Sequence, residues 1–338
     1  MIDVALIGAG KMGISHLSIL GAHPDVRVSG VSDTSKLVTD VLKKFTKFPV
    51  YHDYEQMLNE VNADAVFVAV PTKFHAPMVK RLLGENKHVF AEKPFCLTAE
   101  EGKELVQLAE AKNLVNQVGY HNKFVGTFRE LKKIVDGGFL GKLFHFTGEV
   151  SGPVVVRPKQ DNWRVDPAEG GGCLMDYASH ILDLIISTLG PVESVKGSLL
   201  KPIYSSKVED SVYSLLELSS KLSGVLLANW SDITYRKMST SLTIQGNKGK
   251  IICDANELKV FFYSSDVPGG YSRGWNVKYV TDLTDEVDFY LRGEEYSAQI
   301  DYFIKAIRKE VPNTLNNFQS AWQTDKAISL IKRSNQIK

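Results

Sequence analysis

Short apolar runs alternate with helical patterns over about the first 120 residues. The runs lie at residues 2–7, 26–32, 65–70, 87–91 and 115–119, and Thr98-Ala99-Glu100-Glu101 between the last two is a capping box that opens a helix. Near-continuous apolar runs are typical of parallel strands covered on both faces by helices. The pattern predicts an α/β domain with an open parallel sheet of about six strands, whose ligands lie beyond the carboxyl ends of the strands.

From Lys142 the pattern changes to consecutive short strands with close turns. Strand-like runs occur at residues 142–150, 192–199, 211–218, 224–230, 239–245, 250–253 and 258–263. Short strands in direct succession predict an antiparallel sheet, and therefore a second, α+β domain. Residues 295–309 and 318–333 have the spacing of amphipathic helices.

One helical stretch, Leu174 to Leu189, is apolar on nearly all sides. Three glycines precede it, and Gly190-Pro191 ends it. At 3.6 residues per turn, its short polar residues share one narrow stripe: Asp176, Ser179, His180, Asp183 and Ser187. A stripe facing water usually carries longer charged side chains, so this one favours the wall of a site. The alternative is that Asp176 and His180 form a hydrogen-bonded pair inside a core.

A glycine pattern, Gly8-Ala9-Gly10-Lys11-Met12-Gly13, joins the first strand to the first helix. In this context it is the dinucleotide fingerprint: Gly10 lets the backbone approach the phosphates, and Gly13 lets helix and strand pack closely. Asp33 follows Gly13 by 20 residues, where an acid accepts hydrogen bonds from the adenosine ribose and favours NAD. Alternatively, Asp33 is a helix N-cap, and both roles are compatible. Lys36 keeps NADP possible.

Polar residues follow the predicted strands at the edge where a ligand is expected. They are Pro71, Thr72 and His75, then Glu92, Lys93 and Pro94, then Tyr120, His121 and Asn122. Pro94 pushes Lys93 into an extended conformation at a strand end, which directs its side chain toward the ligand. For His75 and His121, an ordinary hydrogen-bonding role is the alternative.

The connection from Gly152 to Gly172 is long and carries basic and aromatic residues: Arg157, Lys159, Trp163 and Arg164. Loops of this length are often functional. We expect a lid over a hydroxylated or anionic substrate, with Trp163 stacking on a sugar face. A solvated surface loop is the alternative.

Composition limits the classes of partner. The 338 residues include 40 Lys and Arg against 39 Asp and Glu, so no global charge favours nucleic acid or a membrane surface. Hydrophobic residues at 43% and charged residues at 23% are typical of globular domains. Three scattered cysteines indicate a reducing compartment, and neither a signal peptide nor a membrane span is evident, so we expect a cytoplasmic protein with a small-molecule partner.

Taken together, the fingerprint, Glu92-Lys93-Pro94 and Gly170-Gly-Gly-x-Leu-x-Asp176-x-x-x-His180-x-x-Asp183 resemble the glucose–fructose oxidoreductase, inositol dehydrogenase and rhizopine catabolism (Gfo/Idh/MocA) family. The resemblance implies a Rossmann domain over residues 1–122. It implies an α+β domain over 123–338 with a large, mainly antiparallel open sheet that forms homodimers or homotetramers. The C-terminal helices are expected to pack back on the Rossmann domain.

The resemblance also implies site residues. Lys93 matches the catalytic lysine, Asp176 the substrate-contacting aspartate and His180 the catalytic histidine of the family. The coenzyme residues would be Gly8, Gly10, Lys11, Met12, Gly13, Asp33, Pro71, Thr72, His75, Glu92 and Lys93. The substrate residues would be Lys93, Tyr120, Asn122, Arg157, Trp163, Arg164, Asp176 and His180. Lys123 departs from the family, because many members have arginine there.

These residues suit an NAD(P)-dependent dehydrogenase that acts on a secondary alcohol of a sugar, cyclitol, sugar acid or nucleotide sugar. His180 would take the hydroxyl proton, Lys93 would stabilise the developing alkoxide, and Asp176 would orient the substrate. Three alternatives stay open. They are a metal site at Cys173, Asp176, His180 and Asp183, a non-catalytic nicotinamide-binding regulator, and a glycosidase that retains NAD. The metal site is disfavoured because Cys173 lies away from the polar stripe.

Overall fold

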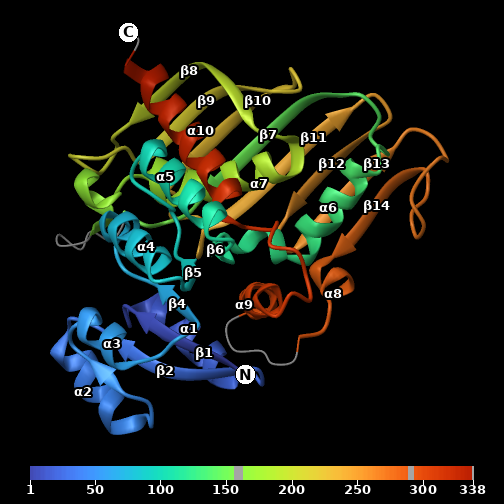
Figure 1. Ribbon diagram of the computed structural model, residues 1–338. Helices are drawn as coiled ribbons and strands as arrows, with labels where there is room; N and C mark the ends of the chain where they lie inside the picture. The colour runs from blue at the N-terminus through green and yellow to red at the C-terminus, as the bar shows by residue number, and fades with distance from the viewer. Residues whose placement is uncertain (156–162, 288–292, 337–338) are drawn as a thin grey trace. The chain divides into compact units, whose positions relative to one another are not determined.

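The computed structural model describes residues 1–155, 163–287 and 293–336. The chain divides into two units, shown in Figure 1. The first consists of Met1–His121 and Glu286–Trp322, and the second of Asn122–Asp285 and Gln323–Lys338. The first unit therefore combines the N-terminal domain with a segment from near the C-terminus.

The first unit contains a parallel sheet of six strands with the order β3-β2-β1-β4-β5-β6. The strands are β1 (Ile2–Ile7), β2 (Val26–Ser32), β3 (Val50–Tyr51), β4 (Ala65–Val68), β5 (His88–Ala91) and β6 (Asn116–Val118). The order reverses between β1 and β4, and sheets of this kind bind ligands at the carboxyl ends of the strands beside such a reversal. The predicted open parallel sheet is confirmed. β3 was not among the predicted strands, because two residues show no periodicity.

Helices cover both faces of this sheet (Figure 1). They are α1 (Lys11–Ala22), α2 (Lys36–Phe45), α3 (Tyr54–Glu60), α4 (His75–Gly84), α5 (Ala99–Ala111), α9 (Glu294–Ile307) and the start of α10 (Phe318–Gln336), with a 3-10 turn η1 (Thr72–Phe74). One apolar core joins the sheet to α3, α4, α5 and α10, and the other joins it to α1, α2 and α9. Each face of the sheet is thus buried, as the apolar strands require.

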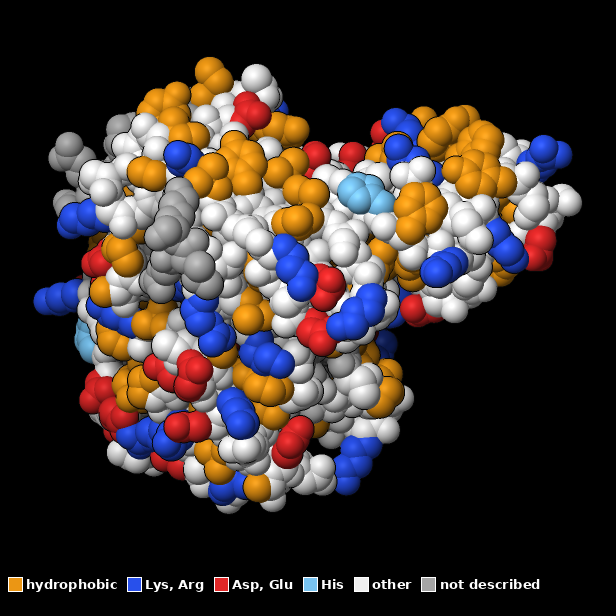
Figure 2. All heavy atoms as spheres, turned by 90° about the horizontal axis from the view of Figure 1, so that it is seen from above, with side chains coloured by type: hydrophobic (Ala, Val, Ile, Leu, Met, Phe, Trp, Pro, Cys, Tyr) orange, Lys and Arg blue, Asp and Glu red, His pale blue; other side chains and the backbone are white. Residues whose placement is uncertain are grey.

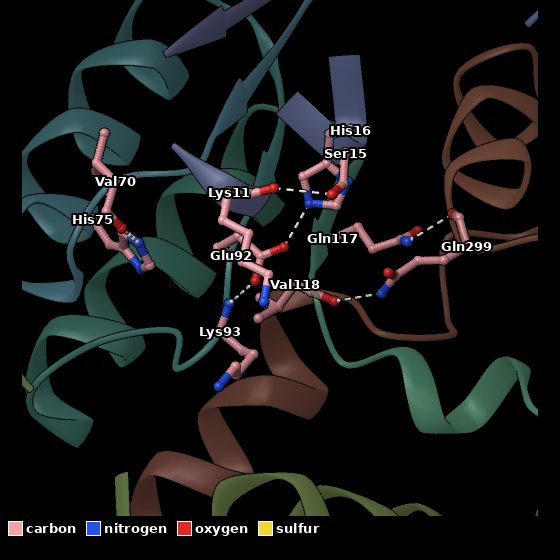
Figure 3. A network of polar contacts seen from close by, with 10 residues as sticks. All are labelled: Lys11, Ser15, His16, Val70, His75, Glu92, Lys93, Gln117, Val118 and Gln299. Atoms are coloured by element: carbon pink, nitrogen blue, oxygen red, sulfur yellow. Dashed lines mark hydrogen bonds and ion pairs between the residues drawn. The ribbon is translucent and has the colours of Figure 1, made fainter. Parts of the chain in front are cut away.

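The C-terminal segment also covers the outer edge of β6. Val118 donates its N–H to Asn316 O at 2.8 Å. Gln117 Nε2 donates to Gln299 O at 2.9 Å, and Gln299 Nε2 donates to Val118 O at 3.3 Å, as Figure 3 shows. An uncovered strand edge leaves backbone groups unpaired and invites aggregation. The segment therefore completes the first unit.

The turn from β1 to α1 depends on two glycines. Gly8 has φ +90°, and a Cβ at this residue would lie 2.5 Å from Ala69 O. A Cβ at Gly13 would lie 1.9 Å from Gly8 O, so any side chain there would force the helix away from the strand. The close packing predicted for Gly13 is therefore present.

The second unit contains an eight-stranded sheet with the order β14-β13-β12-β11-β7-β10-β9-β8. The strands are β7 (Leu143–Ser151), β8 (Val192–Lys201), β9 (Ser211–Leu218), β10 (Ser223–Asn229), β11 (Ser239–Gly246), β12 (Gly249–Asp254), β13 (Glu257–Phe262) and β14 (Gly274–Tyr279). β7 and β10 run parallel, and the other neighbours run antiparallel. The mainly antiparallel sheet is confirmed, while edge strand β14 lies outside the predicted runs.

One face of this sheet is covered by α6 (Gly126–Asp136) and α7 (Ser179–Leu189) (Figure 1). A Cβ at Gly148 in β7 would lie 2.6 Å from Ile185 Cδ1, so α7 packs closely on the strand. The remaining helical elements are the 3-10 turns η2 (His121–Phe124), η3 (Trp163–Val165) and η4 (Pro167–Glu169), the π-helical turn η5 (Leu174–Ala178) and α8 (Val280–Leu283). Helix α6 was not among the predicted elements, although Phe128, Leu131 and Ile134 have helical spacing.

Hydrophobic side chains stay exposed on the sheet of the second unit. Trp275 and Tyr279 on β14 are 57% and 55% exposed, and Tyr213 on β9 is 46% exposed. Figure 2 shows hydrophobic side chains gathered on the right of the view, the side on which Figure 1 places β13 and β14. Exposed apolar patches of this kind often mark a protein interface.

In the described part of the chain, every helix is too short or too polar to span a bilayer.

We expect Gly13→Ala to lower the free energy of unfolding by about 3 kcal/mol, because the methyl group must displace backbone. Gly21 provides a matched control in the same helix, since a Cβ there meets no atom within 4 Å. Gly21→Ala should raise the free energy of unfolding by up to about 1 kcal/mol. Urea unfolding of both variants measures the difference. Equal midpoints for Gly13→Ala and the unsubstituted protein would contradict the close packing.

Candidate functional site

The amino end of α1 forms an open anion site in the first unit. A Cβ at Gly10, the N-cap residue, would meet no atom within 4 Å. The first turn carries no acidic side chain, so its N–H groups and the helix dipole present positive charge. This arrangement suits a pyrophosphate, in agreement with the predicted fingerprint.

Asp33 connects β2 to the glycine loop. Its Oδ2 accepts a hydrogen bond from Ala9 N at 2.7 Å, and its Oδ1 accepts one from Ser35 N at 2.8 Å. The N-cap of α2 is Ser35, so the alternative of Asp33 as the helix cap is wrong. A carboxylate has further lone pairs, and a contact with the ribose hydroxyls stays a prediction.

His75 is fully buried behind the loop that follows β4. Its Nε2 lies 2.9 Å from Val70 O, and its Nδ1 lies 3.0 Å from Pro94 O. Burial lowers the pKa of the imidazole, which favours its neutral form. The ring is 0% exposed, so any contribution to coenzyme binding would pass through the loop that it holds. Thr72, in η1, is also buried.

Glu92 and Lys93 follow β5, and the peptide bond between Lys93 and Pro94 is cis. His16 Nε2 lies 2.5 Å from Glu92 Oε1 (Figure 3). Burial would raise the pKa of Glu92, but the hydrogen bond and charge of His16, with the ammonium group of Lys93, outweigh it and lower the pKa. The buried carboxylate is therefore ionised. Sequence reasoning named Glu92 but missed His16, whose partner is 76 residues away.

The residues after β6 have packing contacts. Tyr120 is buried, and its backbone oxygen accepts a hydrogen bond from Asn316 Nδ2 at 2.5 Å. The ring of His121 stacks on Tyr296 with the centroids 4.7 Å apart, in line with the ordinary role considered for it. Asn122 is buried in η2. Substrate contacts by Tyr120 and Asn122 stay predictions.

Three glycines, Gly170 to Gly172, lead into the predicted site helix of the second unit. Gly170 and Gly172 have φ +87° and +107°, in the left-handed region that favours glycine. A Cβ at Gly171 would lie 2.3 Å from Arg164 O. Each of the three positions therefore favours glycine for its backbone conformation or for its lack of a side chain.

The first turn after the glycines is π-helical, which corrects the expected regular helix. Leu174–Ala178 forms η5, and α7 begins at Ser179. Glu209 Oε1 accepts from Leu174 N at 2.8 Å, and Glu209 O accepts from Cys173 N at 3.0 Å. Periodicity could not show this turn, because its anchor is 35 residues away. π-helical turns are frequent at functional sites.

Asp176 and His180 are both buried, at 2% and 4% exposure. Arg164 Nε donates to Asp176 Oδ2 at 2.8 Å, and the guanidinium carbon of Arg164 lies 4.7 Å from the centre of the Trp163 ring. Arg164 of the predicted lid therefore contacts the predicted motif, and Trp163 contacts Arg164. Arg157 and Lys159 lie outside the described residues.

Asp183, one turn beyond His180, forms a buried ion pair. Its Oδ1 lies 2.8 Å from Lys123 Nζ, and the two side chains are 1% and 4% exposed. Burial raises the pKa of Asp183 to about 6, although the charge and hydrogen bond of Lys123 oppose the rise. Lys123, where the family often has arginine, thus has a structural partner.

Metal ligands do not cluster in the described part of the chain, where no group of three or more His, Cys, Asp or Glu side chains could hold an ion. The three cysteines are free and buried, and burial raises the pKa of Cys173 well above its usual value. A buried neutral thiol at this position fits a packing role.

Comparison with known proteins agrees with this geometry. Residues 2–120 match the oxidoreductase family with the NAD-binding Rossmann fold, and residues 128–252 match the GFO/IDH/MocA C-terminal domain. The chain belongs to the Gfo/Idh/MocA family. Its first unit holds the NAD-binding Rossmann domain of that family, and the resemblance inferred from the motifs is confirmed.

Characterised and uncharacterised members of the family are among its relatives. An uncharacterized oxidoreductase of Schizosaccharomyces pombe is 34% identical over 65% of this chain and 61% of its own length. Myo-inositol 2-dehydrogenase of Thermotoga maritima is 25% identical over 74% of this chain and 75% of its own. The solved structure of levoglucosan dehydrogenase with NADH has a TM-score of 0.87 at 21% identity, covering 99% of this chain and 97% of that one. This likeness shows the fold.

We predict that Lys123→Met lowers the free energy of unfolding mainly at neutral and alkaline pH. Because the pKa of Asp183 is raised from 3.8 to about 6, the fold favours its neutral form, and this contribution is lost as the pH rises through about 6. Without Lys123 the charged form lacks its partner, so the loss should be about 3–5 kcal/mol at pH 8 and smaller at pH 5. Urea unfolding at both pH values measures it.

Lys132 is the matched control, because its ion pair with Asp136 at 3.0 Å involves side chains that are 44% and 58% exposed. Lys132→Met should change the free energy of unfolding by less than about 1 kcal/mol at either pH. A loss for Lys123→Met that is equal at pH 5 and pH 8 would show that Asp183 does not carry the effect.

Proposed function

We propose that this protein is an NAD-dependent dehydrogenase that interconverts a secondary alcohol and a ketone on a sugar, a cyclitol or a derivative of either. The observation that carries the proposal is the burial of Asp176 and His180 in consecutive helical turns, with Arg164 donating to Asp176. Both residues match family motifs, as does Lys93. Relatives and structural neighbours are named for myo-inositol and levoglucosan, which supports a carbohydrate or cyclitol substrate.

The coenzyme would be held by the first unit. The open amino end of α1 suits the pyrophosphate, with Gly8, Gly10, Lys11, Met12 and Gly13 around it. Asp33 would accept hydrogen bonds from the ribose and repel the additional phosphate of NADP. The loop of Pro71 and Thr72 and the turn of Glu92 and Lys93 follow neighbouring strands. Bound nicotinamide would accept or return the hydride.

Three side chains would handle the substrate oxygen. His180 would take the hydroxyl proton, since an imidazole with an ordinary pKa of about 6.5 exchanges protons near neutral pH. Lys93 would donate a hydrogen bond to the same oxygen and stabilise its developing negative charge. Asp176 would orient the neighbouring hydroxyls. In the direction of reduction, His180 returns the proton.

The other predicted substrate residues include two, Arg164 and Trp163, whose contacts the structure describes. Arg164 Nε donates to Asp176 Oδ2, which holds a guanidinium group, the kind of group that binds carboxylate and phosphate, beside a proposed substrate residue. Trp163 is half-buried beside it and presents an aromatic face. We therefore propose that both contact the substrate, and we keep Arg157, Tyr120 and Asn122 as further proposed contacts.

We also propose that the protein forms a homodimer or homotetramer through the sheet of its second unit. On β14, Trp275 and Tyr279 are exposed, and Trp275 pairs with Phe261 of β13 in an edge-to-face contact with centroids 5.3 Å apart. Burying such a surface against a second copy would remove apolar area from water. A cytoplasmic location stays a prediction, supported by the three free cysteines.

The dehydrogenase proposal predicts formation of reduced nicotinamide with a member of a panel of aldoses, inositols, sugar acids and nucleotide sugars. NAD should give a higher kcat/KM than NADP. Lys93→Met and His180→Asn should each lower kcat by about 100-fold or more, because each removes a charge or proton-transfer group used in the transition state. Absorbance of the reduced coenzyme measures both effects.

Other outcomes of this panel distinguish the remaining candidates. Consumption of a glycoside with no net reduction of tightly bound NAD would favour the NAD-retaining glycosidase. Measurable NAD binding with no turnover across the panel and across glycosides would favour a regulator. Full turnover by His180→Asn would remove His180 as the base.

The interface proposal predicts that Trp275→Glu raises the dissociation constant of the oligomer by about 10-fold or more, because a charge would be placed in an apolar contact. Multi-angle light scattering across a dilution series measures the mass. Phe45→Glu is the control, since Phe45 is 75% exposed on α2 of the first unit. A monomeric unsubstituted protein at micromolar concentration would refute the interface.

A further inference from the structure

The carboxylate of Glu92 has contacts on all sides within the first unit. Its Oε1 lies 2.5 Å from His16 Nε2, and its Oε2 accepts a hydrogen bond from Lys93 N at 3.1 Å. A Cβ at Gly119 would lie 2.9 Å from both carboxylate oxygens. The carboxylate is thus confined between α1, the backbone of Lys93 and the end of β6.

His16 is held as firmly as its partner. It is 1% exposed and lies in the second turn of α1. Its ring makes an edge contact with Phe90, with centroids 5.2 Å apart, and a tilted contact with Phe67 at 5.8 Å. Aromatic packing therefore fixes the direction in which Nε2 points. The contact of the His16 ring with Glu92 therefore connects α1 to the turn after β5. The amino end of α1 is the proposed anion site.

The other side of the same turn is held by His75. Its Nδ1 lies 3.0 Å from Pro94 O and 3.2 Å from Phe95 O, and its Nε2 lies 2.9 Å from Val70 O. The backbone on both sides of Lys93 is therefore fixed by buried side chains. In Figure 3 the amine of Lys93 points away from this network, while the backbone N–H of the residue donates to Glu92.

We propose that Glu92 is a positioning residue for Lys93, and that the pair of His16 and Glu92 couples the coenzyme helix α1 to the lysine. The inference rests on the proposed function, since it assigns Lys93 its role. Glu92 receives the N–H of Lys93 and places a negative charge beside its ammonium group. His16 keeps that carboxylate oriented. The titratable or charged groups around Glu92 that enter this network are His16, Lys93 and His75.

A purely structural role for the pair makes a different prediction. In that case, loss of the carboxylate charge would lower stability and leave the chemistry of Lys93 unchanged. A positioning role requires that kcat falls while NAD binding is retained. It also requires that the surroundings of the Lys93 amine change when the charge is removed, because the carboxylate interacts electrostatically with that amine.

Two variants change the carboxylate in different ways. Glu92→Gln keeps the shape and removes the charge. Gly119→Ala keeps the charge and pushes the carboxylate aside, since the three atoms nearest to the added Cβ all belong to Glu92. Glu104→Gln is the charge control, because Glu104 is 65% exposed on α5. Gly84→Ala is the glycine control, because a Cβ there meets no atom within 4 Å.

The experiment measures three quantities on the full chain. They are the dissociation constant for NAD by calorimetry, kcat and KM with the best substrate of the panel, and the ¹³C chemical shift of methylated Lys93 at one pH. For the last, lysines are reductively methylated with ¹³C-formaldehyde, and the Lys93 resonance is identified by its absence in Lys93→Arg. This chemical shift needs no turnover, so failure of the proposed function and failure of this inference are distinguishable.

We expect Glu92→Gln to lower kcat by about 10- to 100-fold, because small displacements of a catalytic group have effects of this size. The dissociation constant for NAD should change by less than about threefold, because the Glu92 carboxylate is enclosed by His16, the Lys93 amide and Gly119. The methyl resonance of Lys93 should move. Gly119→Ala should show part of each effect. Both controls should match the unsubstituted protein.

An unchanged kcat and an unchanged Lys93 resonance in folded Glu92→Gln would overturn the proposal. If that variant does not fold, the same two measurements on Gly119→Ala decide. A parallel loss of NAD binding and stability, with the Lys93 resonance unmoved, would overturn the positioning role and assign the pair a structural role alone.

Discussion

A carboxylate placed away from water costs free energy unless charged or N–H donors surround it, and the first unit is built around one such group. Glu92 obtains its donors from α1 and from the next backbone amide, and Gly119 leaves the space that its oxygens occupy. β5, β6 and α1 must therefore keep their relative positions. The same constraint fixes the turn that carries Lys93.

Buried acids organise the second unit in a similar way. Glu209 caps the π-helical turn before α7, and Asp183 within α7 binds Lys123. Asp210 accepts from Ser205 N at 2.8 Å and from Trp230 Nε1 at 2.7 Å, which ties the loop before β9 to the end of β10. Each acid specifies one arrangement, because any shift would leave a charge without its partner.

The proposed function uses one feature of each unit. In the second unit, Asp176 and His180 are buried, and Arg164 donates to Asp176. In the first unit, the amino end of α1 is open at Gly10. Under the proposed function, the buried groups would act on the substrate and the open helix end would receive the coenzyme.

The sequence by itself determined most strands of both sheets, the glycine fingerprint, the motif residues of the two units and the family. These features depend on local spacing and on burial, which periodicity records. Tertiary structure alone decided the strands β3 and β14, the π-helical turn, the cover of the β6 edge and the partners of Glu92, Asp183 and Leu174. Those contacts join residues distant in the chain, and a pattern of local positions contains no information about which distant donor will reach a buried acceptor.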